Sequence, residues 1–281
     1  MPTFDTSGPI SATIDVVVGD VRISAGDGAA AVIDVRPSDA SSDEDVKVAE
    51  RTRVEFANEH LLVKAPKLRN WLPRSHGGSI DVTIELPAGS KVRGAGQMTD
   101  FAAAGRLGDS HIRTGMGTVQ LDEVSKPNVK TGIGDITVER ATGHAELTTG
   151  SGDVRAGELD ATAVIKNSNG DTWVGSVAGD LRVQAANGSI AVDRAGASVV
   201  AKSSNGDVRL GEVARGSVVL ETALGDLEVG IPEGVPAWLD ARAVAGRVQN
   251  ALEPGSAPDS GGESVEVRAR TTAGNVLIRR S

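Results

Sequence analysis

Glycines recur about every 18 residues through the middle of this chain. Successive members of the series are 17, 18, 18, 18, 18 and 19 residues apart, and they are Gly117, Gly134, Gly152, Gly170, Gly188, Gly206 and Gly225. Each is followed by a small polar residue and then by an apolar–any–apolar triplet, with Thr172 as the one lapse. A fixed period of this length means that one supersecondary unit is stacked on copies of itself. The repeat therefore constrains the architecture more strongly than any other feature.

A second and looser glycine series lies half a period away, at Gly143, Gly179 and Gly216. Within each unit the residues two and four after the glycine are apolar, whereas those one and three after it are polar or variable. Alternation with a period of two indicates β-strands. Roughly five residues of strand and four of turn then make up each half of the repeat.

Two all-β architectures fit this pattern. One is a β-solenoid with about 18 residues per coil, in which equivalent residues stack roughly 4.8 Å apart. The alternative is an antiparallel meander. The near-constant period favours the solenoid, since a coil tolerates insertions poorly, and it places Asn169, Asn187 and Asn205 in one column.

The regular repeat divides the chain into three regions that we interpret as one continuous structure. These are a strand-rich N-terminal cap region at 1–90, the regular repeat at 91–230, and an irregular repeat with closing strands at 231–281. Ser42 followed by acidic residues predicts one short helix near the N-terminus. Segments 53–56 and 61–63 flank a turn and predict a hairpin. We expect the last strand, Val265–Arg270, to cover the open end of the solenoid.

Composition excludes several classes of function. The 281 residues include no Cys, which removes disulfides, Cys-zinc sites and thiol catalysis. Net charge is −9 with Lys and Arg dispersed among acids, so we expect no nucleic-acid partner. The N-terminus has no signal-peptide pattern and no apolar run approaches a membrane span. We therefore expect a cytoplasmic protein without direct membrane insertion, with non-classical export as the alternative.

Several stretches make the family resemblance visible. They are Gly19-Asp20-Val21-Arg22-Ile23, the strand and turn at 80–90, Lys166-Asn167-Ser168-Asn169-Gly170, and the C-terminal 265–271. In these the chain resembles the bacterial "putative adhesin" β-strand-repeat family, also called toastrack-like, whose members are uncharacterised. The resemblance covers nearly the whole chain. It implies a β-helix-like fold and no established catalytic residues.

Repeated Gly-Asp pairs supply the weak candidates for a metal site. In a solenoid their carboxylates form a column that could hold calcium, and they are Asp135, Asp153, Asp171, Asp207 and Asp226. The calcium-binding β-roll needs Gly-Gly-x-Gly-x-Asp, whereas here Asp follows a single Gly. We therefore interpret these residues as turn residues that bond nearby backbone amides, and we expect no metal or other cofactor.

The loop at 64–76 is the most distinctive segment outside the repeat. We call it the basic loop, and its candidate partner-binding residues are Lys67, Arg69, Trp71 and Arg74. It could contact an acidic partner, nucleic acid or a membrane surface. The alternative, which we favour, is a solvated hairpin tip whose Trp covers the end of the solenoid.

No catalytic site is evident from the sequence. The four histidines, His60, His76, His111 and His144, share no metal-ligand spacing, and no pair of carboxylates stands out from the repeated ones. We expect a non-enzymatic β-repeat scaffold or module that binds an unknown protein partner. A surface or glycan-binding adhesin is the second hypothesis, and a β-helix glycan hydrolase or lyase is the third. The sequence leaves the partner's identity and the oligomeric state open.

Overall fold

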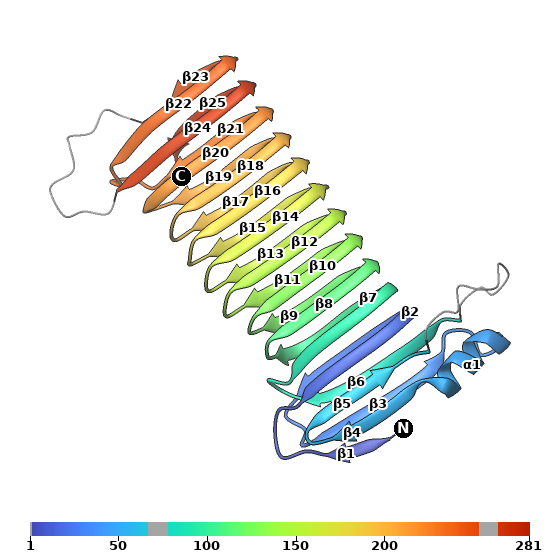
Figure 1. The fold of residues 1–281 in the computed structure, drawn as a ribbon. Coiled ribbons are helices and arrows are strands. Elements are labelled where there is room, and N and C mark those ends of the chain that lie inside the picture. The colour runs from blue at the N-terminus through green and yellow to red at the C-terminus, as the bar shows by residue number, and fades with distance from the viewer. Residues whose placement is uncertain (1, 67–77, 253–263) are drawn as a thin grey trace. The chain divides into compact units, whose positions relative to one another are not determined.

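The computed structural model describes residues 2–66, 78–252 and 264–281. These parts of the chain contain one helix, α1, and 25 strands, β1 to β25. The contacts divide the chain into two compact units, Met1–Val138 and Glu139–Ser281. Figure 1 shows that strands stack side by side within each unit.

Unit 1 contains two sheets, and its two longest strands take part in both. In the first sheet the spatial order is β4 (Arg53–Ala57), β5 (His60–Lys64), the first part of β2 (Ser11–Gly26), the first part of β7 (Lys91–Leu107), β8 (Ser110–Met116) and β10 (Pro127–Ile133). In the second sheet it is β1 (Thr3–Asp5), β3 (Ala30–Pro37), β6 (Ile80–Pro87), the later parts of β2 and β7, β9 (Val119–Val124) and the first half of β11 (Ile136–Ala141), whose second half belongs to unit 2.

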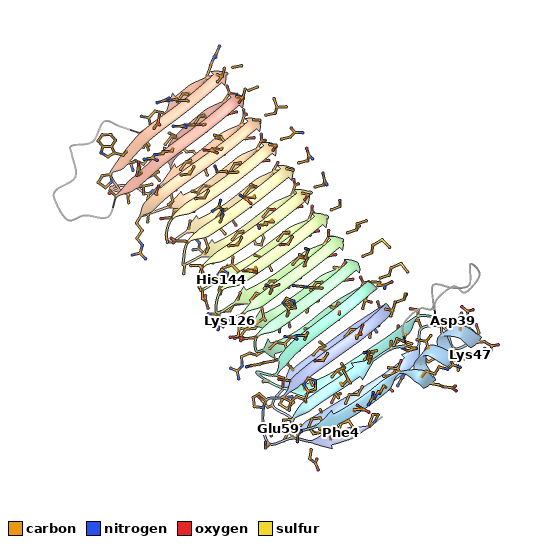
Figure 2. The ribbon with its side chains drawn as sticks, in the orientation of Figure 1. Phe4, Asp39, Lys47, Glu59, Lys126 and His144 are labelled. Atoms are coloured by element: carbon orange, nitrogen blue, oxygen red, sulfur yellow. The ribbon has the colours of Figure 1, made fainter. Side chains whose placement is uncertain are left out.

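The N-terminal end of unit 1 is closed by short or antiparallel elements. Helix α1 (Asp43–Arg51) begins after Ser42, whose hydroxyl accepts the Asp45 N–H, so the predicted helix and its cap are confirmed. The predicted hairpin is β4–β5, with Asn58 and Glu59 at positive φ. Phe4 of β1, labelled in Figure 2, stacks on Phe56 of β4 with ring centroids 5.1 Å apart. This aromatic pair joins the outermost strands of the two sheets.

Unit 2 also contains two sheets, with one strand of each in every coil. The first sheet follows the order β12 (Ala145–Ser151), β14 (Ala163–Asn169), β16 (Leu181–Asn187), β18 (Val199–Asn205), β20 (Gly216–Leu224), β24 (Val265–Ala273) and β22 (Ala237–Ala245). The second follows β13 (Val154–Leu159), β15 (Thr172–Val177), β17 (Ile190–Ala195), β19 (Val208–Val213), β21 (Leu227–Ile231), β25 (Val276–Arg280) and β23 (Val248–Asn250).

The strand register confirms the solenoid and rules out the meander. Each strand of the regular repeat pairs in parallel with the second strand along the chain, and Ile165, for example, lies opposite Leu147 on one side and Val183 on the other. These partners are 18 residues apart, which is the period of the sequence repeat. A meander would instead pair consecutive strands antiparallel.

The side-chain orientation predicted from the alternation is also confirmed. Val208 and Leu210 are buried, whereas Arg209 between them is exposed. The inner row of each strand packs against that of the facing strand, and the core is almost entirely Val, Ile, Leu and Ala. Thin layers of small aliphatic side chains thus form this core, to which Phe101 is the one aromatic contributor among the described residues.

Stacked glycines explain why the period is so constant. Gly188 has a φ of +137°, and a Cβ on it would lie 2.0 Å from the carbonyl oxygen of Gly170 in the neighbouring coil. Gly206 stands in the same relation to Gly188. Only glycine permits both this backbone conformation and this approach of one coil to the next.

The end of unit 2 differs from the sequence expectation. The last strands, β24 and β25, do not cover the end but pair with β20 and β21 on one side and with β22 and β23 on the other. Gly246 accordingly stacks on Gly274, and Gly274 on Gly225. The edge is therefore formed by the earlier strands β22 and β23. Sequence order did not predict this arrangement, because β22 and β23 form the outermost coil. The later strands β24 and β25 lie between that coil and the coil of β20 and β21.

Candidate functional site

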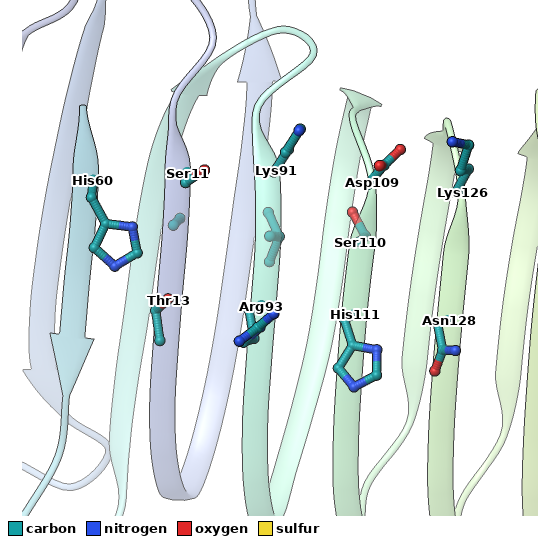
Figure 3. Close-up of a pocket in the computed structure, with 12 residues that line it drawn as sticks. Ser11, Thr13, His60, Lys91, Arg93, Asp109, Ser110, His111, Lys126 and Asn128 are labelled. Carbon is teal, nitrogen blue, oxygen red and sulfur yellow. The ribbon is translucent and has the colours of Figure 1, made fainter. Parts of the chain in front are cut away.

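Two adjoining rows of polar side chains cross the outer face of the first sheet of unit 1. In Figure 3, Lys91, Asp109 and Lys126 lie at one level of neighbouring strands, and Arg93, His111 and Asn128 lie at the next. The register explains this alignment, because Arg93 pairs with His111 and His111 with Asn128. Adjacent members of a row are therefore separated by about one strand spacing, roughly 4.8 Å.

These rows line a shallow depression of about 480 Å³. His60 from β5 and Thr13 from β2 complete one side of it, so residues far apart in sequence share one surface (Figure 3). The depression is open, and ten of its twelve lining residues are polar or charged. It suits contact with an extended surface better than enclosure of a small molecule.

The same outer face carries an excess of unpaired positive charge. We call the six cationic side chains on strands β5, β7, β8 and β10, or directly before β10, the basic face. They are Lys64, Lys91, Arg93, Arg113, Lys126 and Lys130. None of the six forms an ion pair with any residue in the described parts of the chain. Asp15 and Asp109 are the nearby acids on this face, so its net charge is positive within a chain of net charge −9.

The opposite outer face of unit 1 is acidic. Its carboxylates are Asp20, Asp34, Asp81, Glu85, Asp100 and Asp122. Two of the arginines among them are neutralised locally, because Arg22 pairs with Asp20 at 3.2 Å and Arg36 pairs with Asp34 at 2.5 Å, and a third, Arg106, lies opposite Glu123 in the register. Unit 1 thus separates its charges between two faces.

An apolar ridge borders the basic face where its strands end. Met98, Met116 and Ile133 lie side by side on β7, β8 and β10, and all three are exposed. Large exposed apolar side chains that gather in one row often mark a contact surface. The ridge and the basic face together offer a partner both charge and apolar area.

The candidate metal ligands of the Gly-Asp pairs bond the neighbouring coils. Asp153 Oδ1 accepts the Asp171 N–H at 3.0 Å, and Asp171 Oδ1 accepts the Ser189 N–H at 2.8 Å. Asp207 and Asp226 repeat this bond to the next coil, and Asp135 follows Gly134 at the corresponding exposed position. The N–H groups that these carboxylates accept belong to the next coil and not to the turn that carries the Asp. Among the described residues no group of three or more His, Cys, Asp or Glu is arranged to hold a metal ion.

A second polar column was not predicted, although its signal is present in the sequence. Three residues before most of the marking glycines stands a buried Thr, Ser or Asn that donates to a glycine carbonyl of the preceding coil. Thr131 Oγ1 bonds Gly117 O at 3.1 Å, and Thr222 Oγ1 bonds Gly206 O at 3.0 Å. Bonds of this kind satisfy carbonyl groups at the corner of the coil, where the strand ladder is interrupted.

The other candidate residues from the sequence are those of the basic loop and the histidines. The partner-binding candidates of the basic loop, Lys67, Arg69, Trp71 and Arg74, lie outside the described residues. His60 and His111 share the depression on the basic face, a juxtaposition that spacing alone could not reveal because β2 lies between β5 and β7. His144 Nδ1 lies 2.7 Å from Thr162 Oγ1. Over the described segments, no helix is long and apolar enough to span a bilayer.

The fold and its exposed faces define a two-sheet β-solenoid protein. The chain belongs to the Toastrack DUF4097 family, whose model matches residues 6–279. A comparison with curated proteins gives no match.

Solved structures that match this chain include bacterial proteins described as "putative adhesins". One from Parabacteroides merdae is 11% identical, with a TM-score of 0.47 over 99% of this chain and 94% of the other. One from Parabacteroides distasonis is 13% identical, with a TM-score of 0.47 over 98% and 95%. A third, from Bacteroides fragilis, is 14% identical, with a TM-score of 0.39 over 99% and 95%.

Proposed function

We propose that this protein is a non-enzymatic interaction module that binds an acidic segment of a partner protein on the basic face of unit 1. One observation carries the proposal: six cations that are unpaired among the described residues lie in adjoining rows on one sheet face of an acidic chain. Leaving like charges close together costs free energy in the isolated protein, and an anionic partner relieves that repulsion.

Geometry favours an extended partner. Strands present Lys and Arg at regular intervals along and across the sheet, so an acidic segment can meet several cations at once. The apolar ridge of Met98, Met116 and Ile133 adds a contact for hydrophobic side chains of the same partner. We place this encounter in the cytoplasm, and fractionation of the native cell tests that location.

The test uses charge reversal and a labelled glutamate-rich peptide as the probe. The variant Lys91→Glu, Arg93→Glu, Lys126→Glu alters the basic face. The matched control, Lys166→Glu, Arg182→Glu, Arg247→Glu, alters exposed cations of unit 2 that have no ion pair with the described residues. Each reversal changes the charge by two, so both variants go from −9 to −15.

The proposal predicts salt-sensitive binding of the peptide that is lost in the basic-face variant and kept in the control. Equal loss in both variants would reduce the effect to net charge and contradict a specific face. Binding of the wild type to anionic lipid vesicles but not to the acidic peptide would contradict a protein partner.

A glycan-binding role is a second candidate, and Trp173 is the observation that favours it. Its indole ring lies over Gly175 with 40% of the residue exposed, and its register neighbour Ala191 is too small to cover it. Arg194 and Glu158 line the same shallow depression of about 640 Å³. An exposed aromatic face with charged neighbours is suited to stacking on a sugar ring.

A saccharide array tests this second role. The array is probed with wild type, with Trp173→Ala, and with Trp238→Ala as the control for loss of an exposed indole. Glycan binding that only Trp173→Ala abolishes supports the role. Absence of binding by the wild type, or equal binding by both variants, contradicts it.

A further inference from the structure

The C-terminal edge of unit 2 leaves its interior open. Strand β22 pairs with β24 on one side, and no strand in the described parts of the chain pairs with it on the other. The inward side chains Leu239 and Ala241 are only partly buried, whereas their register partners Val267 and Ala269 are 0% exposed. The row of core side chains therefore continues to the edge, and no strand or helix in residues 2–66, 78–252 and 264–281 covers it there.

The outer side of the same strand exposes large apolar residues. Trp238 is 77% exposed and Val244 is 82% exposed, the highest values among the exposed large hydrophobic residues of the described chain. Natural proteins commonly protect an edge strand by making it short or charged, or by covering it. Strand β22 is nine residues long, its charges are confined to the pair Asp240 and Arg242, and no element in the described parts of the chain covers its free side.

The opposite end of the repeat shows what protection looks like in this chain. In unit 1 both edge strands are short, because β1 has three residues and β4 has five. The stacked rings of Phe4 and Phe56 close the gap between those two strands. The open state of β22 is therefore a local property and not a feature of every edge in this protein.

The backbone of β22 is oriented to accept another strand. The Val265 N–H donates to the Pro236 carbonyl at 3.0 Å. By the regular alternation of a parallel ladder, Trp238, Asp240 and Arg242 then direct their N–H and C=O groups to β24. The groups of Leu239, Ala241 and Ala243 point the other way, where none of the described strands pairs with them.

We propose that a second copy of this chain occupies the edge, with the two β22 strands pairing antiparallel about Ala241. In this register Trp238 lies opposite Val244 of the second copy, and Asp240 lies opposite Arg242 of the second copy. Each contact occurs twice because the pairing has twofold symmetry. The strand sequence is thus complementary to itself in both charge and apolar contact.

The geometry of an antiparallel pair supports this register. Ala241, whose backbone groups point outward, forms the central hydrogen-bonded pair, so the flanking pairs at 240 and 238 are non-hydrogen-bonded pairs. Side chains approach most closely in such pairs. The two outer-face contacts therefore fall at the positions where cross-strand contact is tightest, and the half-buried Leu239 and Ala241 become covered from the open side.

Charges on β22 are already organised on one outer face. Asp240 lies 3.1 Å from Arg242 and 3.3 Å from Arg270. The Arg270 guanidinium beside it lowers the pKa of the Asp240 carboxyl, so this group is ionised at neutral pH. Pairing with a second copy extends this alternation of charge across the interface.

The test exchanges the charges of one position at a time. Asp240→Arg places two arginines on each strand, and Arg242→Asp places two aspartates on each. In either variant the self-pairing register brings like charges together, and we expect the dissociation constant of the dimer to rise about tenfold or more. In an equimolar mixture, every Arg of the first variant lies opposite an Asp of the second, so the pairing is restored.

Analytical ultracentrifugation measures these states. The proposal predicts a wild-type species of twice the 28.7 kDa chain mass, weakened self-association of each single variant, and a dimer in their mixture. The matched control Arg182→Asp changes an exposed charge on β16 within the same sheet and should remain dimeric. Restoration on mixing also shows that both single variants are folded.

Three results would overturn the proposal. The first is a wild type that stays monomeric up to about 100 µM, since dimers of ordinary affinity form well below that concentration. The second is that the single variants dimerise as strongly as the wild type. The third is that the two single variants stay monomeric when they are mixed. The outcome is independent of the acidic partner of unit 1, because no residue of the basic face is changed.

Discussion

Replacing Gly188 by alanine tests the claim that stacked glycines set the spacing of the coils. The new Cβ would lie 2.0 Å from the Gly170 carbonyl oxygen and 2.6 Å from its carbon. A carbon–oxygen contact needs roughly 3.3 Å, so the two coils must separate by about 1 Å at this corner. The atoms in the way belong to the backbone, and no side-chain rotation can relieve the contact.

The expected cost has two sources. Alanine at the φ of +137° that Gly188 adopts costs on the order of 1–3 kcal/mol. Separation of the coils also strains the bonds from Gly170 N to Asn187 O and from Thr172 N to Ser189 O, both 2.9 Å long, at about 1 kcal/mol each. We expect a total loss of about 4 kcal/mol, which is large for a single methyl group.

Gly234→Ala provides the matched control within the same unit. Gly234 also has a positive φ, +78°, but a Cβ on it would meet nothing within 4 Å. We expect a loss of about 1 kcal/mol there, because only the backbone conformation is unfavourable. Urea unfolding followed by far-ultraviolet circular dichroism compares the two variants. If Gly188→Ala costs no more than Gly234→Ala, the contact between coils does not set their spacing.

Three further predictions concern the core, the carboxylates and the basic loop. Val208→Asp buries a charge without a partner and should cost several kcal/mol in urea unfolding, whereas the exposed Arg209→Asp should change the midpoint little; equal effects would contradict the side-chain register. The midpoints of thermal unfolding with excess calcium and with a chelator should coincide, because the Gly-Asp carboxylates accept backbone N–H groups. A large rise of the midpoint with calcium would show that these carboxylates bind the metal. Replacing the four candidate residues of the basic loop together should leave the fold intact and weaken recovery of the native partner in a pull-down; undiminished recovery would remove the loop from the partner surface.

Much of the fold could be predicted because the repeat ties local pattern to stacking. The same alternation that identifies the strand of Val208 also fixes which side chains face inward, and the 18-residue period fixes the partner strands. The end of unit 2 could not be predicted in this way. Strands β22 and β24 both fit the repeat, and their spatial order depends on which of two similar strands packs better against β20.

The candidate surface was harder to predict because it depends on register between distant segments. Lys91 and His60 are brought together through Ser11, which pairs with both. In the sequence the six cationic residues of the basic face are dispersed among acidic residues, so composition gave no indication of a basic face. Alternation sends neighbouring charges to opposite sides of a sheet, and only the pairing shows which side gathers the cations.

Site-specific photocrosslinking in the native cell tests the proposed function most directly. Ala95 and Ala104 are both exposed on strand β7, but Ala95 lies on the basic face and Ala104 on the opposite face of unit 1. A photoreactive residue at position 95 should yield an adduct with an acidic protein, and the adduct should disappear when Lys91, Arg93 and Lys126 are reversed to Glu. The same residue at position 104 should not yield it. Equal adducts from both positions, or an adduct at 95 that survives charge reversal, would contradict binding through the basic face.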